Sequence, residues 1–278
     1  KSTLLDDGYI YVRLTSFIEN TGPDLEKVLS DFKSKNNGRI EGILIDLRRN
    51  PGGLLEQAIK VSDLFIKEGV IVSTVSRDPK NKEISYASKK APFGEVPIVV
   101  LLNEFSASAS EIVAGALQDN KRGIIVGTRS FGKGSVQSAI KLGEGSGLKL
   151  TVARYYTPSG ISIQSEGIKP DIEIDEVDTE AFAKVINKSQ ALREKDIAGH
   201  LKGEKEKLSE KNKSIVSAGF DKNNEKGLET NTVAWWKDIA DKKDSDLSDK
   251  EKLFKSDYQA YQAFSYLKAW KTLKNMSK

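Results

Sequence analysis

The chain of 278 residues carries 44 Lys and Arg against 40 Asp and Glu, a net charge of +4, and contains no cysteine. The small charge excess is spread over interspersed residues, which argues against a nucleic-acid-binding protein. The lack of cysteine excludes disulfides, thiolate metal sites and a cysteine nucleophile. No apolar run reaches the roughly 18 residues needed to cross a bilayer.

Short apolar strands alternate with helical patterns over the first 175 residues. Strands are predicted at 9–14, 42–47, 97–102, 124–126 and 148–156, and helices at 23–33, 54–66 and 108–118. Continuous apolar strands separated by helices are typical of a sheet covered on both faces. The sequence therefore predicts an α/β core over 1–175 with mostly parallel strands and covering helices.

Residues 176–278 are more charged, and they are predicted to form a helical C-terminal region. A helix is predicted at 181–201 and a polar linker near 217–232. Aromatic and apolar residues then recur every three or four positions from Phe254 to Leu273, which predicts one helix with an aromatic face. We expect that face to pack against the core or a partner subunit.

Three serines, Ser106, Ser108 and Ser110, lie between a predicted buried strand and a helix. A serine at such a junction is exposed at the carboxyl edge of the sheet, where the free N–H groups and the helix dipole stabilise negative charge. This position suits a nucleophile. A helix N-cap is the alternative, with Glu111 completing a capping box three residues after Ser108.

A nucleophilic serine needs a base, and the one histidine, His200, lies in a charged segment typical of a solvated helix. A lysine with a neutral amine can replace it. Lys133 is the strongest candidate, because flanking glycines allow a close approach to another segment. If the following residues turn helically, Gln137 is placed to hold the amine by a hydrogen bond.

Two segments of the chain are rich in glycine. The Lys133 segment nearly matches a phosphate-binding loop, but Gly134 stands where a Ser or Thr must bind magnesium, so the sequence argues against nucleotide binding. The turn at 46–53, which reads DLRRNPGG, follows a buried strand, and its glycines are able to direct an N–H group at an oxyanion. An ordinary strand-to-helix loop is the alternative.

Four ordered blocks together resemble the C-terminal processing peptidases, the tail-specific serine proteases of peptidase family S41. The blocks lie at 46–53, at 106–119 (SASASEIVAGALQD), at 131–137 (FGKGSVQ) and at 156–171. The resemblance implies a crotonase/ClpP-like core with a charged helical C-terminal extension. It covers about residues 5–175, and the closing aromatic helix also looks like the end of the bacterial members.

Matching the family pattern residue by residue assigns a role to each block. The resemblance implies that Ser108 is the nucleophile, that Lys133 is its general base, and that Gln137 supports the lysine. The N–H groups of Gly53 and Ala109 match the oxyanion hole. Asp119 matches an acidic position for which we expect a supporting, structural role.

The implied function is that of a serine endopeptidase that cleaves proteins at or near their C-termini through an acyl-enzyme, without cofactor or metal. The expected partners are protein or peptide substrates with accessible C-termini, with an adaptor protein and homo-oligomer formation through the C-terminal helices left open, and without nucleic acid or nucleotide. A non-catalytic scaffold or peptide-binding module with the same fold is the alternative.

The resemblance also implies a location in the bacterial periplasm or cell envelope, reached by an exported precursor. Members of the family usually carry a PDZ domain before the strand that opens this chain. Since the chain begins at Lys1, close to that strand, we expect the PDZ domain to be absent from it.

Overall fold

The computed structural model describes residues 1–143, 145–177, 239 and 242–276. Contacts divide the chain into two units, one formed by Lys1–Val177 with Lys243–Lys278 and the other by Asp178–Lys242. The predicted helix at 181–201, the predicted linker near 217–232 and His200 lie outside the described residues. In the part of the chain that is described, no helix is both long and apolar enough to span a membrane.

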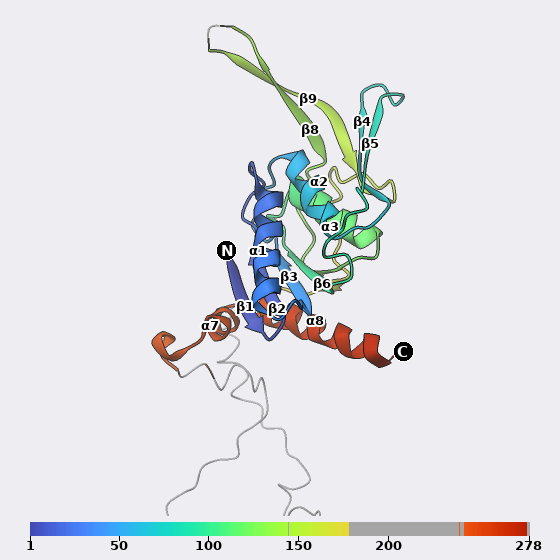
Figure 1. Cartoon of the computed structure of the whole chain (residues 1–278). Coiled ribbons are helices and arrows are strands. Elements are labelled where there is room, and N and C mark those ends of the chain that lie inside the picture. The colour runs from blue at the N-terminus through green and yellow to red at the C-terminus, as the bar shows by residue number, and fades with distance from the viewer. Residues whose placement is uncertain (144, 178–238, 240–241, 277–278) are drawn as a thin grey trace, which may run out of the picture. The chain divides into compact units, whose positions relative to one another are not determined.

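A six-stranded sheet forms the centre of the first unit (Figure 1). Its spatial order is β1 (Ser2–Asp6), β2 (Tyr9–Arg13), β3 (Gly42–Asp46), β6 (Ile98–Leu102), β7 (Ile124–Gly127) and β10 (Ile172–Glu173). The strands from β2 to β10 run parallel, and β1 pairs antiparallel with β2. All five residues of β3 and of β6 are buried. The predicted α/β core with a mostly parallel sheet is therefore confirmed.

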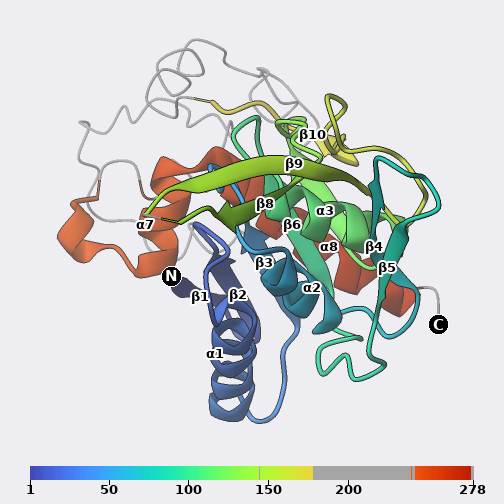
Figure 2. The ribbon, with the colours of Figure 1, turned by 90° about the horizontal axis from the view of Figure 1, so that it is seen from above.

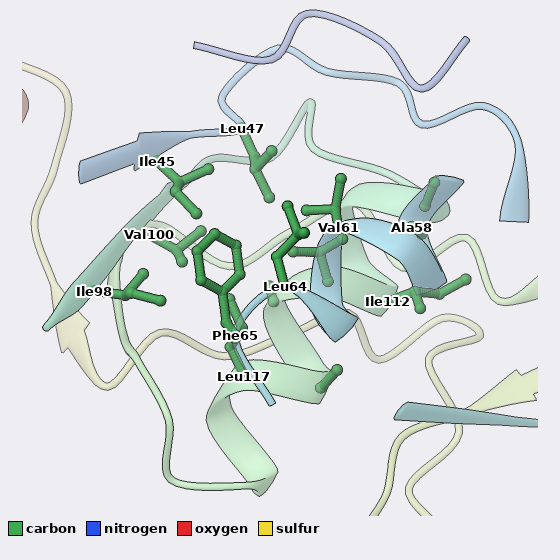
Figure 3. Packing of buried hydrophobic residues seen from close by; sticks show 14 of the residues in the cluster. Ile45, Leu47, Ala58, Val61, Leu64, Phe65, Ile98, Val100, Ile112 and Leu117 are labelled. Atoms are coloured by element: carbon green, nitrogen blue, oxygen red, sulfur yellow. The ribbon is translucent and has the colours of Figure 1, made fainter. Parts of the chain in front are cut away.

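Helices cover both faces of this sheet. The helices α1 (Thr21–Lys35), α2 (Leu55–Asp63) and α3 (Ala109–Asp119) lie on one face of the sheet. The main hydrophobic cluster is enclosed between these helices and that face. Figure 3 shows Phe65 at the centre of this cluster, next to side chains from β3, β6 and α3. The opposite face of the sheet is covered by α8 (Tyr258–Met276), which contacts β3 and β6. The loops that follow the parallel strands leave the sheet at its carboxyl edge, between these two layers of helices.

A second, antiparallel sheet has the order β5 (Lys82–Tyr86), β4 (Val70–Ser76), β9 (Gly147–Tyr156) and β8 (Ser135–Lys141). The sequence predicted only β9 among these strands. The hairpin of β8 and β9 projects from the core in Figure 1, and Figure 2 shows the same strands from above. Gln137 lies on β8, next to an irregularity in the pairing between Val136 and Gln137. The helical turn considered for Lys133 to Gln137 is therefore wrong.

The aromatic C-terminal segment forms two helices where the sequence predicted one, since α7 (Asp249–Ser256) ends before α8 begins. The carboxylate of Asp257 accepts a hydrogen bond from the Ala260 N–H (2.9 Å) and so caps α8. The Phe264 ring of α8 lies 5.5 Å from the Tyr9 ring of β2 and 5.5 Å from the Phe254 ring of α7. Residues 243–278 belong to the same unit as the core. The C-terminal region expected at 176–278 is therefore split between the two units.

Candidate active site

Ser108 stands at the junction between β6 and α3 with a backbone that few residue types adopt. Its φ of 54° and ψ of −112° lie outside the regions favoured by residues with a side chain. Such strained backbone is concentrated at functional sites, because only a surrounding structure can impose it. The Ser108 N–H donates to Glu111 Oε2 (2.7 Å), as the predicted capping box requires. Ser108 is half-buried, and its side chain reaches the surface.

The two neighbouring serines are enclosed. Ser106 and Ser110 are both fully buried. Ser106 Oγ donates to the carbonyl of Leu47 (2.9 Å), and Ser110 Oγ donates to the carbonyl of Asn50 (3.0 Å). Both hydroxyls therefore fasten the serine loop to the turn after β3. This arrangement makes Ser108 the one serine of the three that is accessible to a substrate.

The turn after β3 lies directly against the serine loop. The Asn50 carbonyl accepts from the Ala107 N–H (3.0 Å) as well as from Ser110. Gly52 has a φ of 98°, and a Cβ at this position would lie only 2.9 Å from the Ala109 nitrogen. Glycine is therefore required here both by the backbone conformation and by the close approach.

Two N–H groups beside Ser108 have no acceptor among the described residues. Gly53 forms a parallel bridge with Phe17. The bridge uses the Phe17 N–H to the Gly52 carbonyl (2.9 Å) and the Leu54 N–H to the Phe17 carbonyl (2.8 Å), which leaves the Gly53 N–H free. The Ala109 N–H, at the first turn of α3, also donates to no described residue. Both groups are available to an oxyanion.

Glu111 connects the serine loop to the lysine loop. This residue is fully buried, and each of its two carboxylate oxygens accepts two hydrogen bonds. Oε2 accepts from the backbone N–H groups of Ser108 (2.7 Å) and Lys133 (2.9 Å). Oε1 accepts from the Gly132 N–H (2.7 Å) and from Ser130 Oγ (2.6 Å). The backbones of the two predicted dyad residues are thus held by one oxygen atom.

Lys133 is half-buried, and its Nζ forms no ion pair or hydrogen bond with another residue that the structure describes. The flanking glycines pack against the segment that follows β9, as the sequence predicted. A Cβ at Gly134 would lie 2.4 Å from the Gln164 nitrogen, and Gly132 accepts from the Ser165 N–H (2.9 Å). The fourth sequence block therefore supports the loop that carries Lys133.

The remaining two predicted site residues are differently placed. Gln137 is exposed on β8, opposite Thr151, and none of its described hydrogen bonds goes to Lys133. Asp119 ends α3, about 15 Å along the helix from its first residue. Its carboxylate accepts from the Ser159 N–H (2.9 Å), so it holds a turn of the fourth block and does not contact Ser108.

A buried ionic network lies behind the turn at 46–53. Arg48 donates through Nε to Asp46 Oδ1 (2.9 Å) and through Nη1 to Asp257 Oδ1 (2.9 Å) and Gln259 Oε1 (2.9 Å). The Tyr11 hydroxyl donates to Asp46 Oδ2 (2.6 Å). The network joins β2, β3 and the start of α8, so the C-terminal helix is attached to the segment that leads into the turn.

These contacts fix the protonation states of the buried groups. Burial alone would raise the pKa of Asp46, but the hydrogen bonds and positive charge of Arg48 hold that pKa below its ordinary value. Burial and the Asp46 carboxylate raise the pKa of Tyr11, which keeps the phenol protonated as a donor. Burial opposes the charge of Arg48, yet its two carboxylate partners raise its pKa.

Sequence reasoning missed the linking role of Glu111 and the network around Arg48. A signal existed for Glu111, because α3 is buried over residues 109–117 and Glu111 is the one ionisable residue among them. A buried carboxylate requires several donors. The network had no comparable signal, since Asp257 follows Arg48 by 209 residues.

The comparisons with known proteins agree on one family. The sequence model described as "Peptidase family S41" matches residues 8–174. A "Carboxy-terminal-processing protease" of Bartonella bacilliformis is 49% identical over 198 residues, which is 70% of this chain and 45% of that protein. A chloroplastic "C-terminal processing peptidase" of Tetradesmus obliquus is 36% identical over 187 residues, covering 66% of this chain and 39% of its own.

Among solved structures, the "Photosystem II D1 C-terminal processing protease" is similar to this chain with a TM-score of 0.55 and 38% identity. The similarity covers 60% of this chain and 42% of that one. The chain thus spans less than half the length of these two curated relatives and of this solved protein.

Proposed function

Since this chain belongs to peptidase family S41, we propose that it is a serine endopeptidase that cleaves protein substrates at or near their C-termini through a Ser108–Lys133 dyad. The names of its relatives support the substrate class. The observation that carries the proposed dyad is the Glu111 carboxylate, because its Oε2 atom accepts from the backbone N–H of both residues.

In the proposed reaction, Ser108 Oγ attacks the carbonyl carbon of the scissile bond while the neutral Lys133 amine accepts the hydroxyl proton. The resulting oxyanion receives hydrogen bonds from the free N–H groups of Gly53 and Ala109. Collapse of the intermediate breaks the C–N bond, and the Lys133 ammonium returns its proton to the leaving amine. Water then attacks the acyl carbon while the same amine accepts its proton, and the lysine passes that proton to Ser108 Oγ as the ester bond breaks.

The assignment of the nucleophile is tested with a fluorophosphonate probe, which reacts with activated serines. We expect labelling of the parent chain and of Ser110→Ala, and none of Ser108→Ala. Labelling of Ser108→Ala would place the nucleophile elsewhere. A folded parent chain that is not labelled would favour the non-catalytic scaffold.

The base is tested by cleavage of an unfolded protein with a defined C-terminus. Glu111 holds the backbone of Lys133 and not its amine, so Lys133→Arg preserves the loop while a permanently charged guanidinium replaces the base. We expect no turnover by this variant and normal turnover by Lys141→Arg, an exposed position on β8. Turnover by Lys133→Arg would refute the role of the amine.

Three finer features belong to the same proposal. Gln137 is proposed to support Lys133 when a substrate is bound, as the family resemblance implies. The core is proposed to be of the crotonase/ClpP type. A periplasmic or cell-envelope location is proposed from the family resemblance; one relative is bacterial and another is chloroplastic. Protease accessibility in fractionated cells measures that location.

A further inference from the structure

A polar pocket of about 290 Å³ lies at the carboxyl ends of β2, β3 and β6, beside the junction of α7 and α8. Ligands of open α/β sheets bind at this edge. The polar residues that matter for its chemistry are Arg13, Arg48, Arg49, Asn103, Glu176 and Asp257. Neither Ser108 nor Lys133 lines this pocket, so it is distinct from the candidate active site.

Asn103 lines the pocket with an amide that is satisfied on one side only. Its Oδ1 atom accepts from the N–H groups of Arg49 (2.9 Å) and Phe105 (3.2 Å) and lies 3.4 Å from the Ser106 hydroxyl. These donors fix the orientation of the amide, because a flipped group would face them with hydrogens. The Nδ2 atom is consequently left without an acceptor, although Asn103 is 1% exposed.

Arg13 has the same need. Its Nε atom is buried without an acceptor, and its guanidinium forms no ion pair with another residue in the described part of the chain. Buried donors without partners cost free energy, so a ligand that accepts from these two groups would gain their hydrogen bonds. Arg13 ends β2, Asn103 follows β6, and both line the same pocket.

The charges around the pocket decide what kind of acceptor fits. Arg48 is shared by Asp46 and Asp257, and Arg49 is paired with Glu176 at 3.3 Å. Of these three arginines, Arg13 alone has no carboxylate partner among the described residues, so its guanidinium is the one available to an acidic ligand. A phosphate dianion would meet the two carboxylates that already line the pocket, and repulsion would weaken its binding.

We propose that this pocket binds a single carboxylate group through Arg13 and Asn103. A guanidinium matches a planar carboxylate in geometry as well as in charge. The ligand is either a small carboxylic acid or the C-terminal carboxylate of a short peptide segment. The site also has a path to the catalytic loop, because Asn103 contacts Ser106 and the backbone of Arg49.

Binding to the full chain is measured by calorimetry at constant ionic strength with four probes: acetate, N-acetyl-dialanine, N-acetyl-dialanine amide and inorganic phosphate. We expect a carboxylate probe to bind, and the amide and phosphate to bind at least tenfold more weakly. Equal affinity for acetate and N-acetyl-dialanine identifies a small acid as sufficient, whereas tighter binding of the dipeptide identifies a peptide terminus.

Two variants locate the binding. Asn103→Asp retains the Oδ1 acceptor and replaces the free donor by a negative oxygen, and Arg13→Gln removes the guanidinium that has no carboxylate partner. Each is expected to lower the carboxylate affinity at least tenfold, while Arg77→Gln, at an exposed position, leaves it unchanged. If Asn103→Asp does not fold, Arg13→Gln decides. Absence of carboxylate binding, equal binding of the amide, tighter binding of phosphate, or unchanged affinity in Arg13→Gln would overturn the proposal.

Discussion

Replacing Glu111 by Gln tests whether one carboxylate holds the two loops of the active site together. The amide keeps one oxygen and substitutes an NH₂ group for the other, so two of the four donors lose their acceptor and face hydrogens instead. Those two are either Ser108 and Lys133 or Gly132 and Ser130. At about 1.5–3 kcal/mol for each hydrogen bond to a charged group, we expect the free energy of unfolding to fall by about 3–6 kcal/mol.

Urea denaturation measures that loss, and peptide cleavage in the absence of urea measures the effect on catalysis. We expect kcat to fall by more than tenfold in the fraction that remains folded, because the backbones of Ser108 and Lys133 are no longer fixed to each other. Asp119→Asn is the matched control at the other end of α3, and it is expected to retain kcat. A Glu111→Gln chain with unchanged stability and unchanged kcat would refute the linking role.

Three further predictions concern the turn and the network behind it. Asp257→Ala removes a partner of the buried Arg48, so we expect a stability loss of about 1–3 kcal/mol and a lower kcat with little change in KM, measured by urea titration and steady-state kinetics. Gly53→Ala is expected to abolish cleavage, because its φ of 145° and a Cβ 2.1 Å from a backbone carbonyl oxygen exclude a side chain. Gly38→Ala is the control, since Gly38 has a φ of 75° but no atom within 4 Å of an added Cβ. This variant is expected to stay active, and it tests whether backbone strain alone abolishes cleavage. Because the pKa of Asp46 is lowered in the folded state, its contribution to the free energy of unfolding is complete above about pH 4 and is lost as the pH falls through the folded pKa. The urea midpoint should therefore decline less steeply with acid in Asp46→Asn than in the parent chain.

The parallel sheet could be predicted because burial determines its sequence. The strand Ile98–Leu102 is uniformly apolar, and a strand of this composition is stable only when both faces are covered. The second sheet lacks that signal. Its edge strand β5 reads KEISY, is mostly exposed, and alternates polar and apolar residues only from Glu83 to Tyr86. Such a strand is specified by its pairing with β4, which a local pattern does not reveal.

The candidate site divides in the same way. Local features singled out the serine segment at a strand-to-helix junction and Lys133 between glycines, and the family resemblance selected Ser108 among the three serines. The helical turn predicted for Gln137 was wrong because a four-residue spacing also occurs in a strand, where pairing with β9 decides the conformation. Spacing alone does not distinguish the two structures when the segment is short.

Glu111 shows how much a capping motif leaves open. A capping box accounts for one hydrogen bond to a glutamate, whereas a carboxylate has room for about four. On an exposed helix, water donates to the remaining lone pairs of the carboxylate. The first nine residues of α3 are buried, so water does not fill them at Glu111. The remaining donors must then come from another segment of the chain. The lysine loop supplies three of them, so the carboxylate of the buried capping residue links the backbones of Ser108 and Lys133, which lie 25 positions apart in the sequence.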